Sequence, residues 1–196
     1  RNFMAELDGL RMWDGKALPK GMKERIAREY ERLRLVDEHI RSLEKEKTER
    51  LKEPDTEALK KVARLQKLPG VGTVISWTLV MEYFGWRNFQ NRREVASLAG
   101  LPPTPYDSGN SRREQGISKA GRGRVRTLSV QMAWVWLRLQ PKSRLSQWYM
   151  QRFAGGGSRM RRIGIVAMAR RLLIDLWRYL EHGVVPEGAL LRESKG

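Results

Sequence analysis

The sequence predicts an all-α protein, in which a compact helical domain follows a long, charged helical arm. From residue 68 onward, apolar residues recur at intervals of three and four, the spacing of helices that bury one face. Upstream, residues 20–52 are dense in Lys, Arg and Glu and carry a narrow apolar stripe, as coiled coils do. Strand-like alternation is absent, apart from a candidate short hairpin within residues 106–126.

The arm is expected to cover residues 1–67. Glu53-Pro54-Asp55 should end its long helix, because proline disfavours the helical conformation in the residue before it, and a second helix is predicted over 56–67. An apolar stripe needs a partner, so the arm is a candidate oligomerisation element; a solvated helix lying on its own domain is an equal alternative. The stripe, at spacings of seven, three, four and three, consists of Ile26, Leu33, Val36, Ile40 and Leu43.

The compact domain is expected at residues 68–183. Three consecutive glycines, 155–157, should form a flexible turn between its last two helices, and residues 184–196 should form a flexible tail. The predicted helices cover residues 72–83, 93–99, 124–139, 143–153 and 160–182.

Composition restricts the function. A net charge of +17 points to the phosphate backbone of nucleic acid as partner, with an acidic membrane surface as the rival. No apolar run is long enough to span a bilayer and no signal peptide opens the chain, so a cytoplasmic protein is expected. The absence of Cys excludes disulfides, zinc ribbons and thiol nucleophiles, and two distant His make a histidine metal site improbable. The chain opens without Met, and we expect it to be the C-terminal part of a longer protein.

A Pro-Gly-x-Gly turn at residues 69–72 lies between two predicted helices, as in helix-hairpin-helix DNA-binding elements. Gly70 and Gly72 would let the backbone approach a phosphate, and the amides that open the next helix would point at it. A plain tight turn that requires positive φ is the alternative.

Residues 106–126, YDSGNSRREQGISKAGRGRVR, are almost devoid of apolar side chains. Ser108 precedes a glycine and should be exposed, but a serine hydroxyl needs help to act as a nucleophile. From chemistry alone a turn-forming role for Ser108 is favoured, and Ser111 and Ser118 are equally eligible nucleophiles. The cations that would hold a scissile phosphate are Arg112, Arg113, Lys119, Arg122, Arg124 and Arg126.

A second basic cluster opens the last predicted helix, where Arg159, Arg161 and Arg162 are candidate phosphate contacts, followed by Arg170-Arg171. A solvated basic face is an equal alternative. Six tryptophans, most of them in apolar helical patterns, are assigned to the core in preference to base stacking: Trp77, Trp86, Trp134, Trp136, Trp148 and Trp177.

Several short motifs in order resemble one family. They are Leu68-Pro69-Gly70-Val71-Gly72, Phe84-Gly85, Phe89, Leu98-Ala99-Gly100-Leu101-Pro102-Pro103, Ser108-Gly109, Gly116-Ile117-Ser118-Lys119-Ala120-Gly121 and Arg124-Val125-Arg126. The chain resembles, over about residues 65–183, the C-terminal transposase domain of the bridge-RNA-guided insertion-sequence transposases, the IS-one-ten family. The upstream helices resemble the coiled coil that precedes this domain.

The resemblance implies a DNA recombinase whose conserved serine forms a covalent phosphoserine link to DNA, and the matching position is Ser108. It also places phosphate contacts at Lys119, Arg122 and Arg126. Family members usually have a serine or threonine before the nucleophile, where this chain has Asp107. This departure leaves the local hydrogen bonding open.

The same resemblance implies partners and a cofactor. The partners are DNA, a guide RNA and further copies of the chain, in a nucleoid-associated prokaryotic protein. Family members also carry a RuvC-like domain whose acidic residues bind Mg²⁺ and complete the active site, and nothing in this chain resembles it. We therefore expect no metal in this chain and an inactive fragment. A non-catalytic nucleic-acid-binding domain and an oligomerisation module are the alternatives.

Overall fold

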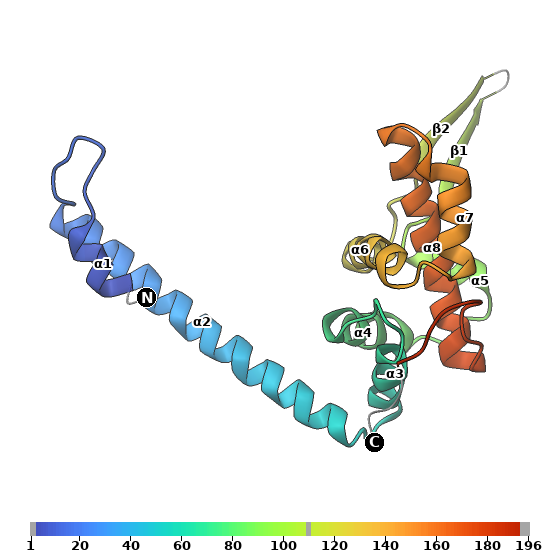
Figure 1. The fold of residues 1–196 in the computed structure, drawn as a ribbon, viewed down its shortest axis with the longest axis horizontal. Coiled ribbons are helices and arrows are strands. Elements are labelled where there is room, and N and C mark those ends of the chain that lie inside the picture. The colour runs from blue at the N-terminus through green and yellow to red at the C-terminus, as the bar shows by residue number, and fades with distance from the viewer. Residues whose placement is uncertain (1–2, 109–110, 193–196) are drawn as a thin grey trace. The chain divides into compact units, whose positions relative to one another are not determined.

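A computed structural model describes the backbone of residues 3–108 and 111–192, and the side chains of these residues except for 105–115. Contacts divide the chain into two compact units, Arg1–Glu53 and Pro54–Gly196. Helices dominate both units, and the sheet of the described chain has two short strands (Figure 1). The predicted all-α class is therefore confirmed. Among the described helices, none is long and apolar enough to cross a membrane.

The first unit consists of a short helix packed on a long one. α1 (Phe3–Gly9) was not predicted from the sequence, whereas α2 (Lys20–Lys52) has the predicted bounds. The two helices are joined by the stacked rings of Phe3 and Tyr30, 4.5 Å apart, and by an ion pair of 3.2 Å between Lys23 and Asp8. These contacts fasten α1 to the N-terminal part of α2.

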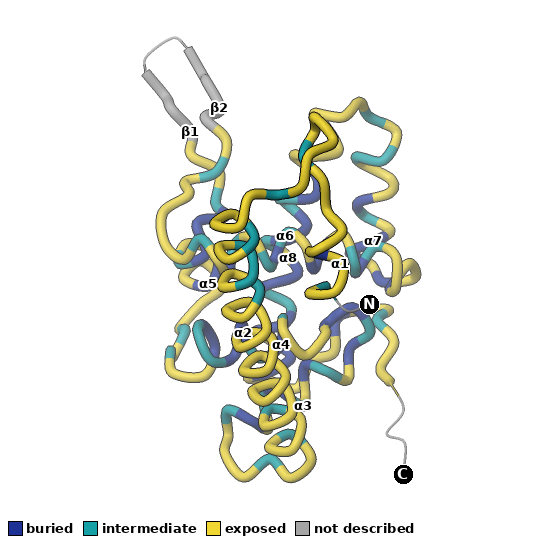
Figure 2. Tube along the Cα trace, turned by 90° about the vertical axis from the view of Figure 1, so that its left-hand side faces the viewer, coloured by how far each residue is buried: buried dark blue, intermediate teal, exposed yellow. Residues whose placement is uncertain are grey.

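Within the first unit, most of the apolar stripe of α2 is uncovered, although Ile26 is half-buried. No residue of α2 is buried, and Figure 2 shows most of the helix in the colour of exposed residues. Leu33, Val36, Ile40 and Leu43 are each about half exposed, between 47% and 58%. Their exposure fits a stripe that needs a partner, and the oligomeric role of the arm stays a prediction.

Helix α3 (Glu57–Gln66) belongs to the second unit. Thr56 caps it by accepting a hydrogen bond from the Leu59 amide at 3.2 Å, close to the predicted start. Its buried residues Leu59, Val62 and Leu65 face the domain, because α3 packs on α4 and α8. The predicted arm included this helix, whereas the compact units divide between residues 53 and 54.

The remaining helices lie close to their predicted positions. Two of them end in a π-helical turn: the Gly85 amide, for example, donates to the Val80 carbonyl at 2.7 Å. The helices are α4 (Thr73–Leu79) with its π-turn η1 (Val80–Phe84), α5 (Arg92–Leu98), α6 (Gly123–Leu139), α7 (Arg144–Tyr149) with its π-turn η2 (Met150–Ala154), and α8 (Ser158–His182).

The core of the second unit forms where α6 crosses α8 (Figure 1). Met132 and Trp136 of α6 and Met168 and Leu172 of α8 are fully buried. The Trp136 indole N–H donates to the hydroxyl of Ser143, the cap of α7, at 2.9 Å. Trp136 thus links α6 to the start of α7, and its assignment to the core is confirmed. The same assignment is wrong for Trp86 and Trp134, which are 56% and 48% exposed.

The segment after α8 returns to the domain. Gly183, in the left-handed conformation, ends α8. The buried Gln140 side chain then donates to the Pro69 and Leu190 carbonyls and accepts from the Leu190 amide, and the Arg192 amide donates to Lys67. Residues 184–192 are therefore held by hydrogen bonds, in contrast to the expected flexible tail.

Candidate nucleic-acid interface

Ser108 is the last residue of a β-strand. β1 (Pro103–Ser108) pairs antiparallel with β2 (Ser111–Ile117), and Ser108 lies opposite Ser111. The hairpin extends away from the helices (Figure 1). The side chains of Ser108, Arg112 and Arg113 lie outside the described residues, so their predicted roles stay predictions.

The base of the hairpin is fastened to the C-terminal end of α5. The amides of Ser118, Lys119 and Arg122 donate to the carbonyls of Pro102, Gly100 and Leu98, at 2.9, 3.2 and 3.0 Å. These three hydrogen bonds fix the point from which the hairpin leaves the domain.

Two glycines make this close approach possible. Gly100 and Gly121 have φ of +66° and +88°, and a Cβ on either would overlap a carbonyl oxygen of the facing segment, that of Ala120 or of Leu98. Lys119 also has a positive φ, +56°, and among the described residues it is the single non-glycine residue with a positive φ. Any larger residue at the two glycines would push the hairpin base off α5.

Arg126, in the first turn of α6, ties the same two segments together. Its guanidinium Nη1 donates to the Lys119 carbonyl at 3.0 Å and, at the longer distance of 3.4 Å, to that of Ala99. The side chain is half-buried. Arg126 therefore has an internal role that the sequence did not predict, beside its predicted phosphate contact.

Among the cations of the loop whose side chains the structure describes, Lys119, Arg122 and Arg124 are exposed. Arg124 pairs with Glu82 at 2.7 Å while 67% of its side chain stays exposed. The guanidinium of Arg122 lies 5.4 Å from the centre of the Trp86 ring, which Arg87 approaches to 4.2 Å. Trp86 is 56% exposed. These groups and Lys119 surround the hairpin base with accessible positive charge and one exposed aromatic ring.

The two glycines of the predicted helix-hairpin-helix element differ. Gly70 is buried, with φ of +102°, and its Cα faces Trp136. Gly72 is exposed, immediately precedes α4 and has open space where a Cβ would lie. The positive φ of Gly70 fits the tight-turn alternative, whereas Gly72 has the exposure that a phosphate contact requires.

Arg159, Arg161 and Arg162 are exposed in the first two turns of α8. The first turn of α8 contains no acidic residue, so no carboxylate compensates the positive end of the helix dipole there. The predicted contact residues thus occupy separate elements: the α3–α4 turn, the hairpin and its base, the start of α6 and the start of α8.

Residues 62–147, from α3 to α7, match the family described as Transposase IS116/IS110/IS902. The chain contains a transposase domain of this family. The match covers the hairpin, its glycine-rich base and the helix-hairpin-helix-like turn.

Whole transposases show the same relationship. The chain is 40% identical over 98% of its length to the putative transposase y4rJ of Sinorhizobium fredii, of which it covers 50%. It is 30% identical over 67% of its length to the transposase for insertion sequence element IS1328 of Yersinia enterocolitica, of which it covers 38%. It thus spans half or less of the length of these transposases.

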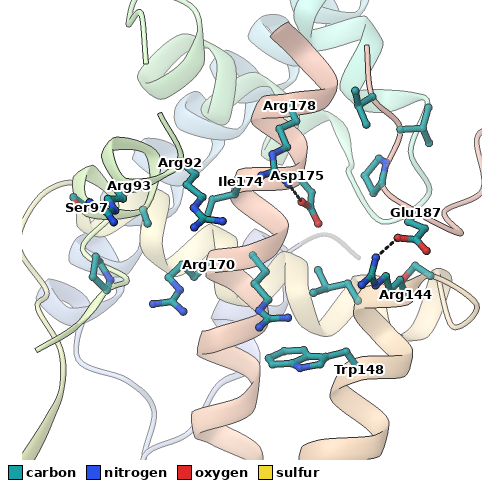
Figure 3. Close-up of a pocket in the computed structure, with 18 residues that line it drawn as sticks. Arg92, Arg93, Ser97, Arg144, Trp148, Arg170, Ile174, Asp175, Arg178 and Glu187 are labelled. Carbon is teal, nitrogen blue, oxygen red and sulfur yellow. Dashed lines mark hydrogen bonds and ion pairs between the residues drawn. The ribbon is translucent and has the colours of Figure 1, made fainter. Parts of the chain in front are cut away.

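The second unit also contains a basic cleft, partly beyond the matched residues, that was not predicted as a site. Six arginines from three helices line it, and only the Arg170-Arg171 pair was noted in the sequence (Figure 3). Burial raises the pKa of Asp175 in this cleft, against the opposing effect of Arg178. Partial burial and the neighbouring cations Arg170 and Arg152 lower the pKa of Arg171. Both shifts reflect a crowded, partly desolvated cluster.

Within the described part of the chain, no group of three or more His, Asp or Glu side chains could hold a metal ion.

Proposed function

We propose that this domain belongs to a DNA transposase in which Ser108 is the nucleophile. Its support is the family match over residues 62–147, which includes the hairpin whose first strand, β1, ends at Ser108. In the proposed step, Ser108 Oγ forms a bond to a DNA phosphorus and the bond to one deoxyribose oxygen breaks. The serine proton passes to a base, and the leaving oxygen takes up a proton.

The neighbouring residues would position the phosphate. A hairpin anchored by three backbone hydrogen bonds gives the nucleophile a defined point of attachment, which limits the orientations to be frozen at the transition state. Lys119, Arg122 and Arg124 carry exposed charge beside that base, where guanidinium and ammonium groups stabilise charge on the phosphoryl oxygens. Target choice by a guide RNA and assembly into a homo-oligomer belong to the same proposal.

A covalent adduct tests the nucleophile. Full-length transposase carrying this domain, its guide RNA, Mg²⁺ and a gapped DNA substrate should yield a protein–DNA adduct that survives a denaturing gel and maps to Ser108. Ser108→Ala should abolish the adduct and recombination while DNA binding stays near normal, because a hydroxyl contributes little to affinity for the backbone.

Two serines of the same hairpin region serve as matched controls. Ser111→Ala and Ser118→Ala should retain the adduct, and Ser118 makes its hydrogen bond to Pro102 through the backbone, which alanine preserves. Recombination by the Ser108→Ala enzyme would refute the proposal. Salt-sensitive DNA binding without any adduct would instead support a non-catalytic binding domain.

A further inference from the structure

A cleft of about 1060 Å³ lies between α5, α7, α8 and the segment that follows α8. Figure 3 shows Arg92 of α5 next to Arg170 of α8, and Arg144 with Glu187 at the other end of the cleft. We call this site the arginine cleft, after the residues Arg92, Arg93, Arg144, Arg170, Arg171 and Arg178. It consists of residues that are far apart in sequence and meet only in the fold.

The arginine cleft has more positive charge than its own carboxylates neutralise. Asp175 and Glu187 are its two acidic residues; Asp175 lies 3.6 Å from Arg178, and Glu187 lies 2.5 Å from Arg144. Among the described residues, the other four arginines have no ion-pair partner: Arg92, Arg93, Arg170 and Arg171. Four of the six guanidinium groups thus remain uncompensated by a carboxylate of the cleft.

One of these cations is held in place by an aromatic ring. The Arg171 guanidinium lies 4.0 Å from the centre of the Trp148 ring, and Trp148 packs edge-to-face on Phe153. A guanidinium ordered by its protein neighbours loses less freedom when it binds an anion. The stacking therefore favours a binding role for the arginine over a freely solvated one.

Clustered like charges destabilise the free domain, and a ligand with several anionic groups would relieve this repulsion. The cations are spread over three helices along a cleft at the upper end of the size of small-molecule sites, so a single small anion would leave most of them uncompensated. A chain of phosphates can contact several of these cations at once, and its oxygens match the fork geometry of guanidinium groups.

We propose that the arginine cleft binds the phosphate backbone of a nucleic acid, at a site separate from the hairpin that carries Ser108. The assignment of a nucleic acid rests on the proposed function, and the +17 net charge of the chain supports it. The shared chemistry is a run of phosphodiesters, supplied either by DNA or by RNA. The two sources are separated by the experiment.

The test compares the 196-residue chain with the double variant Arg92→Gln/Arg170→Gln. Binding to a short duplex DNA and to a single-stranded RNA is measured from about 50 to about 200 mM salt. Loss of two phosphate contacts should weaken binding by about tenfold per contact at 0.1 M salt and reduce the log–log salt slope by about 2 for DNA. The ligand that shows this loss is the one that occupies the cleft.

The control variant, Arg28→Gln/Arg138→Gln, removes the same net charge from exposed residues outside the cleft. It should retain most of the affinity. An equal loss of affinity in the cleft variant and the control variant would show an effect of net charge alone and would overturn the proposal. Unchanged binding of both nucleic acids by the cleft variant would overturn it as well. Polyglutamate serves as a probe for an acidic protein partner. If the cleft variant loses only polyglutamate binding, the cleft binds an acidic protein and the proposal is wrong.

Thermal unfolding separates binding from folding. Because Arg92 and Arg170 lack ion-pair partners among the described residues, the cleft variant should unfold at the same or a higher temperature than the parent chain. The charge-preserving variant Arg92→Lys/Arg170→Lys should regain part of the affinity if phosphates bind there. The serine adduct of the full-length enzyme is measured independently, so failure of the cleft proposal leaves the nucleophile assignment open to its own test.

Discussion

Arg124 and Arg126 lie two residues apart on α6, yet their guanidinium groups have different partners. Arg126 donates to the backbone carbonyls of Ala99 and Lys119, so its guanidinium group holds the hairpin base. Arg124 pairs with the half-buried Glu82 carboxylate, and because most of the Arg124 side chain is exposed, water competes for its guanidinium group. At the scale of a single residue, the partner decides whether an arginine is structural or available to a ligand.

Substitution of each arginine by Gln should reveal this difference. Arg126→Gln removes hydrogen bonds from a charged donor to the exposed Lys119 carbonyl and the partly buried Ala99 carbonyl, and should lower the free energy of unfolding by about 1–3 kcal/mol. Arg124→Gln breaks an exposed ion pair and should lower it by less than about 1 kcal/mol. Urea unfolding of the two variants, followed by circular dichroism, measures both values.

DNA binding distinguishes the two roles of Arg126. If its guanidinium is engaged internally, Arg126→Gln should leave the salt slope of DNA binding unchanged, whereas Arg124→Gln should reduce it by about 1. A stable Arg126→Gln protein with a reduced slope would instead make Arg126 the phosphate contact that the sequence predicted.

At the scale of elements, local spacing was sufficient to locate most helices. The recurrence of apolar residues at three and four placed α2, α4, α5, α6, α7 and α8, because a helix that buries one face must repeat in this way. The same spacing could not tell what covers that face. Leu59, Val62 and Leu65 were assigned to an arm, while the structure buries them against α4 and α8. The short α1 has too few residues to show any period.

The exposed stripe of α2 makes a prediction about assembly. Leu33→Gln/Ile40→Gln should lower the mass of the chain in sedimentation velocity if the stripe pairs with another copy, since both side chains are about half exposed here. Helicity should persist, because α2 buries none of its residues within the chain.

Leu35→Gln is the matched control, since Leu35 is 54% exposed and lies off the stripe. It should leave the mass unchanged. If the parent chain, the stripe variant and the control all sediment as the same species, α2 is a solvated helix and the oligomeric role is excluded.

At the scale of the whole molecule, the two candidate nucleic-acid sites differ in how far the sequence reveals them. The hairpin site is contiguous, so that Ser108 and the basic residues up to Arg126 could be read as one unit with a family pattern. The arginine cleft combines Arg92, Arg144 and Arg170 with a segment after α8, and no local spacing links these positions. Such a site can be recognised only once the packing of α5, α7 and α8 is known.

The boundary of the folded domain leads to a last prediction, made with two truncated chains. A chain that starts at Pro54 should fold cooperatively, because it keeps α3 with its three buried side chains and the bond from the Arg192 amide to Lys67. A chain that starts at Leu68 loses all of these. Each buried Leu or Val contributes about 1.5–3 kcal/mol, so their sum is comparable to the whole stability of a typical domain, about 5–15 kcal/mol.

The shorter chain should therefore be largely unfolded by circular dichroism and show no cooperative thermal transition. A cooperative transition with unchanged midpoint in both chains would return α3 to the arm, where its sequence alone had placed it.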